Sequence, residues 1–443
     1  MGITDRPRLT VLGTGYLGAT HAVCMTELGF EVLGMDVDQD KIARLTAGEA
    51  PFFEPGLAEL LQKNLDTGRL RFTTSMAEVA EFGDVHFICV GTPQKKGEYA
   101  ADLSYVEASC TELARYLTRP ALVVGKSTVP VGTAADMVER IRALAPAGAD
   151  VDLAWNPEFL REGFAVEDTL RPNRLVFGVT SRWAEQRLRE VYASVISAGC
   201  PVVVTDYATA ELVKVAANSF LATKISFINA MAEVCETVHA DVTKLADALG
   251  YDERIGHRFL HAGLGFGGGC LPKDIRAFMA RAGELGADQA LTFLKDVDAI
   301  NMRRRARTVD LARELLDGSF HGARVTVLGA AFKPNSDDIR DSPALDVATS
   351  IHRQGARVTV YDPAAIENAR RAQPELNYAD TAADAAQDAD LVLLLTEWTE
   401  FRQMHPDTLA QVVARRNLVD GRNALDPQRW RDAGWTYRAL GRP

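Results

Sequence analysis

Short apolar runs alternate with amphipathic stretches along the first half of the chain. Residues 8–36 contain a strand pattern, a glycine turn, a helical pattern and a second strand pattern. Further apolar runs lie at 84–90, 121–125, 151–155 and 174–179, and helical periodicity separates most of them. Strands that alternate with helices in this way predict a parallel, doubly wound sheet.

The pattern changes near residue 206. From there to about residue 315, apolar residues recur at helical spacing around one glycine-rich segment. Strand patterns return at residue 324 and at 388–398, with a helical pattern near 343–354 and a strand that ends at Asp362. Because this order weakly repeats the opening of the chain, it predicts a second Rossmann-like sheet. We therefore expect an α/β protein in which two Rossmann-like, doubly wound parallel-sheet domains, 1–205 and 316–443, are joined by a central helical domain, 206–315.

The composition restricts the classes of partner. The chain has 443 residues, 47% of them hydrophobic, and a net charge of -11, so neither nucleic acid nor an anionic membrane is an expected partner. No apolar stretch approaches the length of a membrane span, and the apolar run after the first eight residues is too short for a signal core. The six cysteines lack C-x-x-C spacing, which predicts neither disulfides nor a metal site. We expect a soluble, cytoplasmic protein on which Arg303–Arg305 form a solvated helix face.

Three glycines follow the first predicted strand and open the first predicted helix. Gly13, Gly15 and Gly18 have the spacing G-x-G-x-x-G, and Asp36 ends the next strand 23 residues after Gly13. Such a turn lets a dinucleotide pyrophosphate approach the N-terminus of a helix. Asp36 would bind both ribose hydroxyls and repel a 2′-phosphate, which favours NAD over NADP. The alternative is a tight turn that holds no ligand.

A second glycine segment imitates a phosphate loop. Gly125-Lys126-Ser127-Thr128 matches the end of a Walker sequence, but Pro120 stands where the first glycine is required. We therefore expect no nucleotide-hydrolysing loop. Thr128, Thr92 and Glu158 instead lie near the C-terminal ends of predicted parallel strands, where open α/β sheets bind ligands. Each of them alone is as well explained as a turn or cap residue.

Cys270 stands where a helix is predicted to begin. Five glycines precede it within 263–269, and Pro272 suits the first helical turn. Unpaired amides at the helix N-terminus, with Lys273 nearby, favour a thiolate, which a nucleophilic cysteine needs. Asp274 falls on the same helix face. Without this context we would interpret the cysteine as a small buried hydrophobe, as we do for Cys24, Cys89 and Cys235.

Two polar pairs have helical spacing. Lys214 and Asn218 lie four residues apart in an otherwise apolar helical pattern, so their side chains share a face. An ammonium and an amide so placed could stabilise an oxyanion, although a lysine reaching solvent beside an exposed amide is the alternative. Glu158 and Glu162 are one turn apart if a helix starts after Pro157, where they could simply compensate a helix dipole.

Taken together, these segments resemble the UDP-glucose/GDP-mannose dehydrogenase family of nucleotide-sugar dehydrogenases over nearly the whole chain. One departure is Gly269, where many relatives carry serine; it leaves Cys270 in place but affects local hydrogen bonding. The segments that carry the resemblance are GTGYLG at 13–18, GTP at 91–93, STVPVGT at 127–133, NPEFLREG at 156–163, ELVKVAANSFLA at 211–222, GFGGGCLPKD at 265–274 and AFKPNSDDIRDSP at 331–343.

The resemblance implies a four-electron oxidation of UDP-glucose to UDP-glucuronate, with two NAD used in succession. It implies that Cys270 is the nucleophile, that Lys214 and Asn218 stabilise oxyanions, and that Asp274 with Thr128 and Glu158 positions or activates water. The residues implied in catalysis are Cys270, Lys214, Asn218, Asp274, Glu158 and Thr128. Those implied in binding the UDP-sugar are Glu158, Phe159, Leu160, Glu162, Lys214, Asn218, Arg254, Phe259, Gly263, Gly267, Lys333 and Arg422. Those implied in binding NAD are Gly13, Gly15, Tyr16, Leu17, Gly18, Asp36, Lys41, Thr92, Thr128, Glu162, Lys273 and Arg340.

The resemblance also implies a partner of the same kind and leaves other substrates open. Arg254 matches a position that can reach the site of a neighbouring subunit, which implies a homodimer or a larger homo-oligomer. GDP-mannose and UDP-N-acetylhexosamines are alternative substrates, because the cysteine chemistry is shared within the family. Outside the family, the alternatives are a two-electron hydroxyacid dehydrogenase, which forms one NADH per substrate, and an NAD-sensing binding module.

Overall fold

The computed structural model describes residues 6–443, which form two compact units. The first unit contains the chain up to Ala217 together with Arg276–Leu285. The second unit contains Asn218–Ile275 and Gly286–Pro443. The limits of the units fall inside two helices, α10 (Tyr207–Val238) and α12 (Leu271–Glu284), so each of these helices contributes residues to both units.

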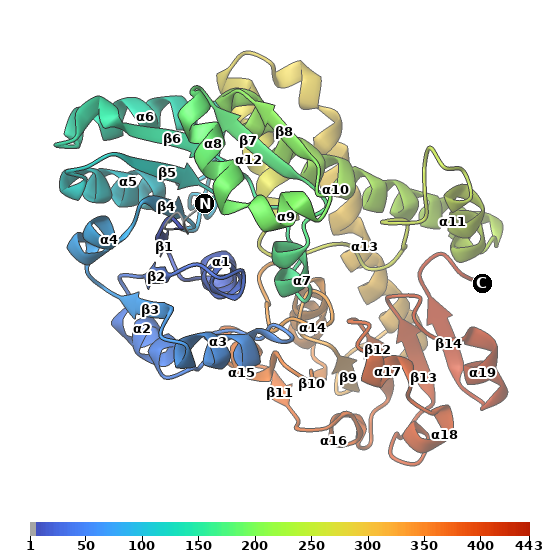
Figure 1. The fold of residues 1–443 in the computed structure, drawn as a ribbon. Coiled ribbons are helices and arrows are strands. Elements are labelled where there is room, and N and C mark those ends of the chain that lie inside the picture. Colours follow the sequence, from blue (N-terminus) through green and yellow to red (C-terminus); the bar gives the residue numbers. More distant parts are fainter. Residues whose placement is uncertain (1–5) are drawn as a thin grey trace. The chain divides into compact units, whose positions relative to one another are not determined.

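The first unit is built on a sheet in the strand order β3-β2-β1-β4-β5-β6-β7-β8 (Figure 1). Its strands up to β6 pair in parallel, as the sequence predicts, but β7 pairs antiparallel with β6. The parallel prediction is therefore wrong for this pair, because only the short helix α7 (Ala165–Leu170) lies between the two strands and provides no full crossover. The strands are β1 (Leu9–Leu12), β2 (Val32–Met35), β3 (Leu70–Thr73), β4 (Val85–Ile88), β5 (Ala121–Gly125), β6 (Val151–Trp155), β7 (Leu175–Val179) and β8 (Val202–Thr205).

Alternate residues of these strands enter two apolar layers. Leu122 and Val124 of β5 belong to a buried cluster with residues of α1, α3 and α8, whereas Ala121 and Val123 belong to a cluster with residues of α4, α5 and α6. This period of two is what a sheet covered on both faces requires. The helices are α1 (Tyr16–Glu27), α2 (Gln39–Thr46), α3 (Leu57–Asp66), α4 (Met76–Phe82), α5 (Ser104–Tyr116), α6 (Thr133–Leu144), α8 (Arg182–Val191) and α9 (Ala193–Ser197).

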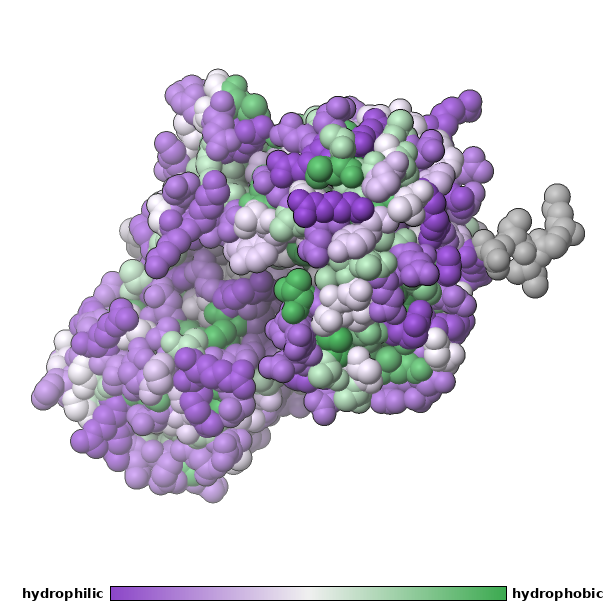
Figure 2. All heavy atoms as spheres, turned by 90° about the vertical axis from the view of Figure 1, so that its left-hand side faces the viewer, coloured by the Kyte–Doolittle hydropathy of each residue, from purple (hydrophilic) through white to green (hydrophobic). Residues whose placement is uncertain are grey.

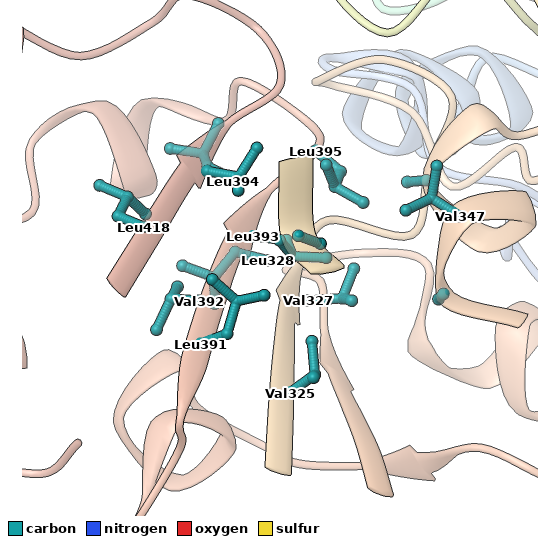
Figure 3. Close-up of a cluster of buried hydrophobic side chains, with 14 of the residues drawn as sticks. Val325, Val327, Leu328, Val347, Leu391, Val392, Leu393, Leu394, Leu395 and Leu418 are labelled. Atoms are coloured by element: carbon teal, nitrogen blue, oxygen red, sulfur yellow. The ribbon is translucent and has the colours of Figure 1, made fainter. Parts of the chain in front are cut away.

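The second unit contains a fully parallel sheet in the order β11-β10-β9-β12-β13-β14, which confirms the predicted second Rossmann-like sheet. Figure 3 shows its core, in which Val325 and Val327 of β9 lie beside Leu391 and Leu393 of β12. The strands are β9 (Arg324–Leu328), β10 (Arg357–Tyr361), β11 (Asn377–Tyr378), β12 (Leu391–Leu394), β13 (Asn417–Asp420) and β14 (Thr436–Ala439).

Helices between residues 207 and 315 confirm the predicted central helical region. It comprises α10, α11 (Val242–Gly250), α12 and α13 (Phe293–Leu315), while the domain limits at 205/206 and 315/316 stay predictions. Around the second sheet, Ser342 caps α14, and Pro343 follows it in the first helical turn. The helices of this part are α14 (Pro343–Arg353), α15 (Ile366–Ala372), α16 (Ala382–Ala386), α17 (Thr399–Arg402), α18 (Pro406–Leu409) and α19 (Pro427–Asp432).

The arginine run of α13 is not a solvated face, so that prediction is wrong. Arg304 is 0% exposed and pairs with Glu236 at 2.7 Å. Arg305 is 5% exposed and pairs with Asp341 at 2.8 Å. Carboxylates of α10 and of the segment before α14 thus meet two of the three guanidinium groups inside the unit, and only Arg303 remains exposed.

The visible surface is mainly polar. Figure 2 shows hydrophilic residues over most of one face, with hydrophobic residues scattered among them in small groups. Within residues 6–443, every helix is too short or too polar to cross a membrane.

Candidate active site

The glycine turn between β1 and α1 leaves open space at one position. Gly13 has a φ of 88°, and a Cβ atom there would lie 2.8 Å from Cγ1 of Val90. A Cβ atom on Gly18 would lie 1.8 Å from the carbonyl oxygen of Gly13. Among the described residues, no atom lies within 4 Å of the Cβ position of Gly15. The fold therefore requires Gly13 and Gly18, whereas Gly15 leaves room for a pyrophosphate at the N-terminus of α1.

Asp36 follows β2 and presents a charged carboxylate beside this turn. Its Oδ2 accepts hydrogen bonds from the backbone N–H of Thr14 at 2.8 Å and from Nζ of Lys41 at 2.9 Å. Burial alone would raise the pKa of Asp36, but the bonds from Lys41 and from backbone N–H groups hold it below its ordinary value. A carboxylate that stays charged can accept hydrogen bonds from ribose hydroxyls, so the residues present fit NAD.

Glu54 supports the same turn, and the sequence analysis missed it. The hydroxyl of Tyr16 donates to Glu54, and burial raises the pKa of Tyr16 well above its usual value. The same carboxylate accepts from the backbone N–H groups of Gly163 and Ala165, both at 2.7 Å. Its contacts lie about 40 and 110 residues away along the chain, so no local motif reveals them. Leu17, the neighbour of Tyr16, lines a cavity of the same unit.

Glu158 and Lys214 form a buried ion pair in the first unit. Nζ of Lys214 lies 2.9 Å from Oε1 of Glu158, and the side chains are 6% and 13% exposed. Oε2 of Glu158 accepts from the backbone N–H of Leu160 at 2.7 Å. The expected helix after Pro157 is absent from this described segment, so Glu158 and Glu162 do not share a helix face. The hydrogen bond from the Leu160 N–H to the Glu158 side chain closes a turn, and this turn stands in place of the expected helix.

An aromatic ring borders the ion pair, and a hydroxyl group joins two strand ends elsewhere in the first unit. The Phe159 ring lies 5.7 Å from Nζ of Lys214 and 3.7 Å from the guanidinium carbon of Arg174. Thr92 donates through Oγ1 to the carbonyl oxygen of Thr128 at 2.8 Å, which joins the segments after β4 and β5. Glu162 is also buried, with 8% of its surface exposed.

Cys270 is exposed and directly precedes α12 in the second unit, as the sequence predicts. Its carbonyl oxygen accepts from the backbone N–H of Asp274 at 2.8 Å. Asp274 is 1% exposed; its Oδ2 accepts from Nδ2 of Asn218 at 2.6 Å, and its Oδ1 lies 2.6 Å from Nζ of Lys273. The carboxylate next to the cysteine is therefore fixed by an amide from α10 and by an ammonium from its own helix.

Close contacts require two of the glycines before Cys270. A Cβ atom on Gly267 would lie 2.2 Å from the carbonyl oxygen of Asp341, and one on Gly268 would lie 2.8 Å from the Phe332 ring. At Gly269 a Cβ atom would lie 2.3 Å from the guanidinium carbon of Arg340. The departure at Gly269 thus gives the flexible Arg340 side chain room beside the cysteine loop.

Arg422 holds the same loop through backbone oxygens. Its guanidinium donates to the carbonyl oxygens of Leu395 at 2.8 Å, Gly265 at 2.9 Å and Phe332 at 3.1 Å. Burial lowers the pKa of Arg422 below its usual value. These bonds give Arg422 a clear role in fixing the loop, while its contact with a nucleotide sugar stays a prediction.

The remaining residues of the predicted sugar site lie apart along the second unit. Gly263 donates its backbone N–H to Oδ1 of Asn229 at 2.9 Å, and Phe259 adopts a positive φ of 65°. Nζ of Lys333 lies 5.3 Å above the Phe332 ring. The Arg254 side chain is 88% exposed and pairs with Asp252 at 2.6 Å, which suits a residue that reaches outward.

The predicted residues thus form two local clusters. Glu158, Lys214, Phe159 and the glycine turn belong to the first unit, whereas Cys270, Asp274, Asn218 and Lys273 belong to the second. The helix α10 carries a member of each cluster, Lys214 and Asn218, one turn apart.

Three family models match successive parts of the chain. The NAD binding domain of the UDP-glucose/GDP-mannose dehydrogenase family matches residues 7–196, its central domain matches 208–303, and its UDP binding domain matches 326–427. The chain belongs to the UDP-glucose/GDP-mannose dehydrogenase family. It is therefore an NAD-dependent nucleotide-sugar dehydrogenase, with a UDP-sugar-binding domain at its C-terminal end.

Similar proteins span the whole length of this family member. It is 42% identical to a UDP-glucose 6-dehydrogenase of Rhizobium meliloti, over 98% of this chain and 100% of the relative. It is 40% identical to the UDP-glucose 6-dehydrogenase TuaD of Bacillus subtilis, over 98% of this chain and 93% of the relative.

Solved structures agree with this assignment. A UDP-glucose dehydrogenase from Pyrobaculum islandicum superposes with a TM-score of 0.92 at 38% identity, and covers 100% of both chains. A UDP-D-ManNAc dehydrogenase from Pyrococcus horikoshii superposes with a TM-score of 0.86 at 28% identity, and covers 98% of this chain and 99% of that one.

Proposed function

We propose that the chain oxidises UDP-glucose to UDP-glucuronate and reduces two molecules of NAD per molecule of substrate. The observation that carries this proposal is an exposed cysteine at the start of α12, with the buried Asp274 carboxylate one turn away. A two-electron alcohol dehydrogenase needs no such nucleophile, whereas oxidation beyond the aldehyde benefits from one. The relatives at 42% and 40% identity that are named UDP-glucose 6-dehydrogenase support the choice of substrate.

The proposed reaction passes through a thioester on Cys270. NAD bound at the glycine turn would supply the hydride acceptor, with one molecule of NAD reduced in each of the two oxidations. After the primary alcohol has lost a hydride and a proton, the Cys270 thiolate attacks the aldehyde carbon; a C–S bond forms and the carbonyl electrons move to oxygen. Loss of the second hydride gives the thioester. Water then adds to its carbon, the C–S bond breaks, and the carboxylate leaves while Cys270 returns to the thiolate and two protons pass to solvent.

Five polar residues have distinct proposed roles in this reaction. Lys214 and Asn218 stabilise the negative charge that collects on oxygen when thiolate or water adds to the carbon. Asp274, with Thr128 and Glu158, positions or activates the attacking water. The ion pair of Lys214 with Glu158 supports this division, because it holds an ammonium and a carboxylate 2.9 Å apart in a buried setting.

A variant without the thiol tests the covalent route. Cys270→Ala should form no UDP-glucuronate from UDP-glucose and NAD, because the aldehyde has no nucleophile to hold it. Cys200→Ala, which removes a partly exposed thiol elsewhere, is the matched control and should retain wild-type acid formation. Product analysis of both reactions by mass spectrometry measures the outcome. Acid formation by Cys270→Ala at the wild-type rate would contradict the thioester route.

Other nucleotide sugars are the second candidates within the family. GDP-mannose and UDP-N-acetylhexosamines share the cysteine chemistry, and the similar Pyrococcus horikoshii structure is named as a UDP-D-ManNAc dehydrogenase. Comparison of kcat/KM for UDP-glucose, GDP-mannose and UDP-N-acetylhexosamines decides between them. UDP-glucose should have the highest value; a higher value for another sugar would move the assignment to that sugar.

We also propose that the chain forms a homodimer or a larger homo-oligomer. On α10, Phe220, Phe227, Val234 and Val238 are 66%, 50%, 53% and 63% exposed, and their spacing places them on one helix face. An apolar stripe of this kind suits association with a second copy. Light scattering should find a mass of at least two chains, and Phe227→Asp should lower it. A monomeric wild-type protein would contradict this proposal.

A further inference from the structure

Lys126 is a buried cation held by neutral oxygens. It follows β5 directly and is 6% exposed. Its ammonium donates to Oδ1 of Asn156 at 3.0 Å, to the carbonyl oxygen of Asn156 at 3.4 Å and to the Tyr192 hydroxyl at 3.3 Å. Burial lowers the pKa of Lys126 to about 8, although Cys89 and Glu158 act in the opposite direction. A buried charge without a hydrogen-bonded carboxylate destabilises a fold, so its presence calls for a function.

The ammonium fixes Asn156, which lies two residues before Glu158. The backbone N–H of Asn156 donates to the carbonyl oxygen of Gly125 at 2.8 Å, and its Nδ2 donates to the carbonyl oxygen of Val176 at 3.0 Å. Its Oδ1 accepts from Tyr192 at 2.7 Å as well as from Lys126. Pro157 follows with a restricted φ, so the placement of Asn156 is passed on to Glu158.

Packing alone does not fix this segment. A cavity of about 50 Å³ lies within the first unit, lined by residues that include His21, Lys126, Asn156, Glu158 and Tyr192. The His21 Nε2 atom is buried there without a hydrogen-bond partner among the described residues. Because this space is not filled by side chains, the hydrogen bonds of Asn156 determine where the segment before Glu158 lies, and Lys126 is the charged donor among them.

We propose that Lys126 is the positioning residue of Glu158, holding the Asn156-Pro157-Glu158 segment so that the carboxylate meets Lys214 in the orientation that the reaction needs. This inference rests on the proposed function, in which Glu158 takes part in the steps at the reacting carbon. Lys126 itself touches neither substrate nor cofactor in this proposal. A merely structural lysine would instead contribute to the stability of the sheet.

The pKa values of three groups near Lys126 differ from its own, so its titration can be told apart from theirs. Burial and Lys126 lower the pKa of His21 well below 6.5, while burial raises the pKa of Cys89 to about 12 and that of Tyr192 far above its usual value. Among His21, Cys89, Tyr192 and Lys126, only Lys126 therefore has a pKa near 8. The titratable and charged groups that face Lys126 or line the cavity beside it are His21, Cys89, Glu158, Asp168, Arg174, Tyr192 and Lys214.

The test compares Lys126→Met with wild type in the full-length protein. With UDP-glucose and NAD, kcat should fall about 10- to 100-fold while KM for NAD stays within about 2-fold, because a displaced Glu158 impairs the chemistry and leaves the cofactor turn intact. The wild-type rate should fall as pH rises through about 8, and the variant should lack this step. The unfolding temperature of Lys126→Met should be equal to or above that of wild type.

A second variant and a control complete the test. Asn156→Asp places a carboxylate against the ammonium, so the inflection near pH 8 should move upward. Lys63→Met, on the surface of α3 where the lysine side chain is 60% exposed, should keep wild-type rates. Wild-type kcat and pH profile in Lys126→Met, or a large loss of its stability, would overturn the inference. A wild-type protein that forms no NADH from UDP-glucose would refute the proposed function instead, and so the two failures are distinct.

Discussion

The two sheets of this chain share a strand order but differ at the place where a dinucleotide would bind. Each begins with a central strand that is followed by a glycine, Gly13 or Gly329, and each has an aspartate after the neighbouring strand, Asp36 or Asp362. In the first sheet α1 begins at Tyr16, directly after the short turn. In the second, residues 329–342 separate β9 from α14. The same topology therefore supports a helix N-terminus close to the sheet in only one case.

The two aspartates show the consequence of this difference. Asp362 is 2% exposed, and its Oδ2 accepts from the N–H groups of Ala330 at 2.8 Å, Ala331 at 3.0 Å and the Trp398 indole at 3.0 Å. Its carboxylate is used to close the long segment after β9. Among the described residues, Asp36 accepts from four internal donors against five for Asp362, and its Oδ1 accepts only from the backbone N–H of Asp38 at 3.1 Å, so this oxygen keeps acceptor capacity beside an open glycine turn. The Rossmann-like strand order thus sets where a ligand crevice lies. The turn after the first strand determines which ligand fits into it.

Substituting the two aspartates gives the largest expected effects. Asp362→Ala should lower the free energy of unfolding by about 3 to 5 kcal/mol, because several buried N–H groups lose their acceptor. Asp36→Ala should raise KM for NAD about 10- to 100-fold with a smaller loss of stability, because a charged acceptor for ribose is removed. For both variants, chemical denaturation measures the free energy of unfolding and NAD saturation curves measure KM for NAD. The comparison fails if Asp362→Ala instead weakens NAD and leaves stability unchanged.

Substituting two glycines sharpens the contrast. Gly329 has a φ of 112°, and a Cβ atom there would lie 2.4 Å from Thr396, so Gly329→Ala should destabilise the fold by about 2 kcal/mol and leave KM for NAD unchanged. Gly15→Ala should keep stability within about 0.5 kcal/mol but raise KM for NAD about 10-fold, since the methyl group occupies the space left for the pyrophosphate. Thermal unfolding measures the stability of both variants, and steady-state kinetics measure their KM for NAD. Equal loss of stability in the two would show that Gly15 serves the fold alone.

An effect of about the same size, which depends on pH, is expected from the helices that follow the fifth strand of each sheet. In the second sheet α19 is capped by its own Asp426. In the first, α6 is held by Glu211 of α10, which accepts from the N–H groups of Gly132 at 2.8 Å and Ala134 at 2.7 Å. Burial, opposed by these bonds, raises the pKa of Glu211 to about 7.

This raised pKa makes the stability of the first unit depend on pH. The folded protein holds the Glu211 proton more tightly than the unfolded chain, so its contribution is present below about pH 4.5 and is lost as pH rises through about 7. Relative to Glu211→Gln, wild type should lose about 2 kcal/mol of stability between pH 5 and pH 7. Denaturant titrations of both proteins at the two pH values check this. A difference that does not change with pH would contradict the raised pKa.

Periodicity predicted the elements that are governed by local burial. The opening strand, helix and strand, the start of α10 near residue 206 and the strands β9, β10 and β12 of the second sheet follow their apolar spacing, whereas β11, β13 and β14 were not predicted. In these segments, each strand or helix is buried along the face that the pattern defines. The cysteine at the start of α12 could likewise be placed from glycine and proline positions alone.

Features that depend on distant partners could not be predicted. The antiparallel pairing of β7 depends on how the segment after β6 turns back, and the Glu158 segment is held by Lys214 rather than by helical bonds. Arg304 is buried only because Glu236 of another helix meets it. Glu54 supports Tyr16 from a loop without any motif. Each error therefore comes from a charged side chain or a turn whose partner lies far away in the sequence.

The most direct test of the central claim counts electrons. Limiting UDP-glucose is turned over to completion without oxygen and with excess NAD, NADH is measured by absorbance, and the product is identified by mass spectrometry. The account predicts two NADH per UDP-glucose consumed and UDP-glucuronate as the product. One NADH per substrate with an aldehyde or ketone product would contradict it.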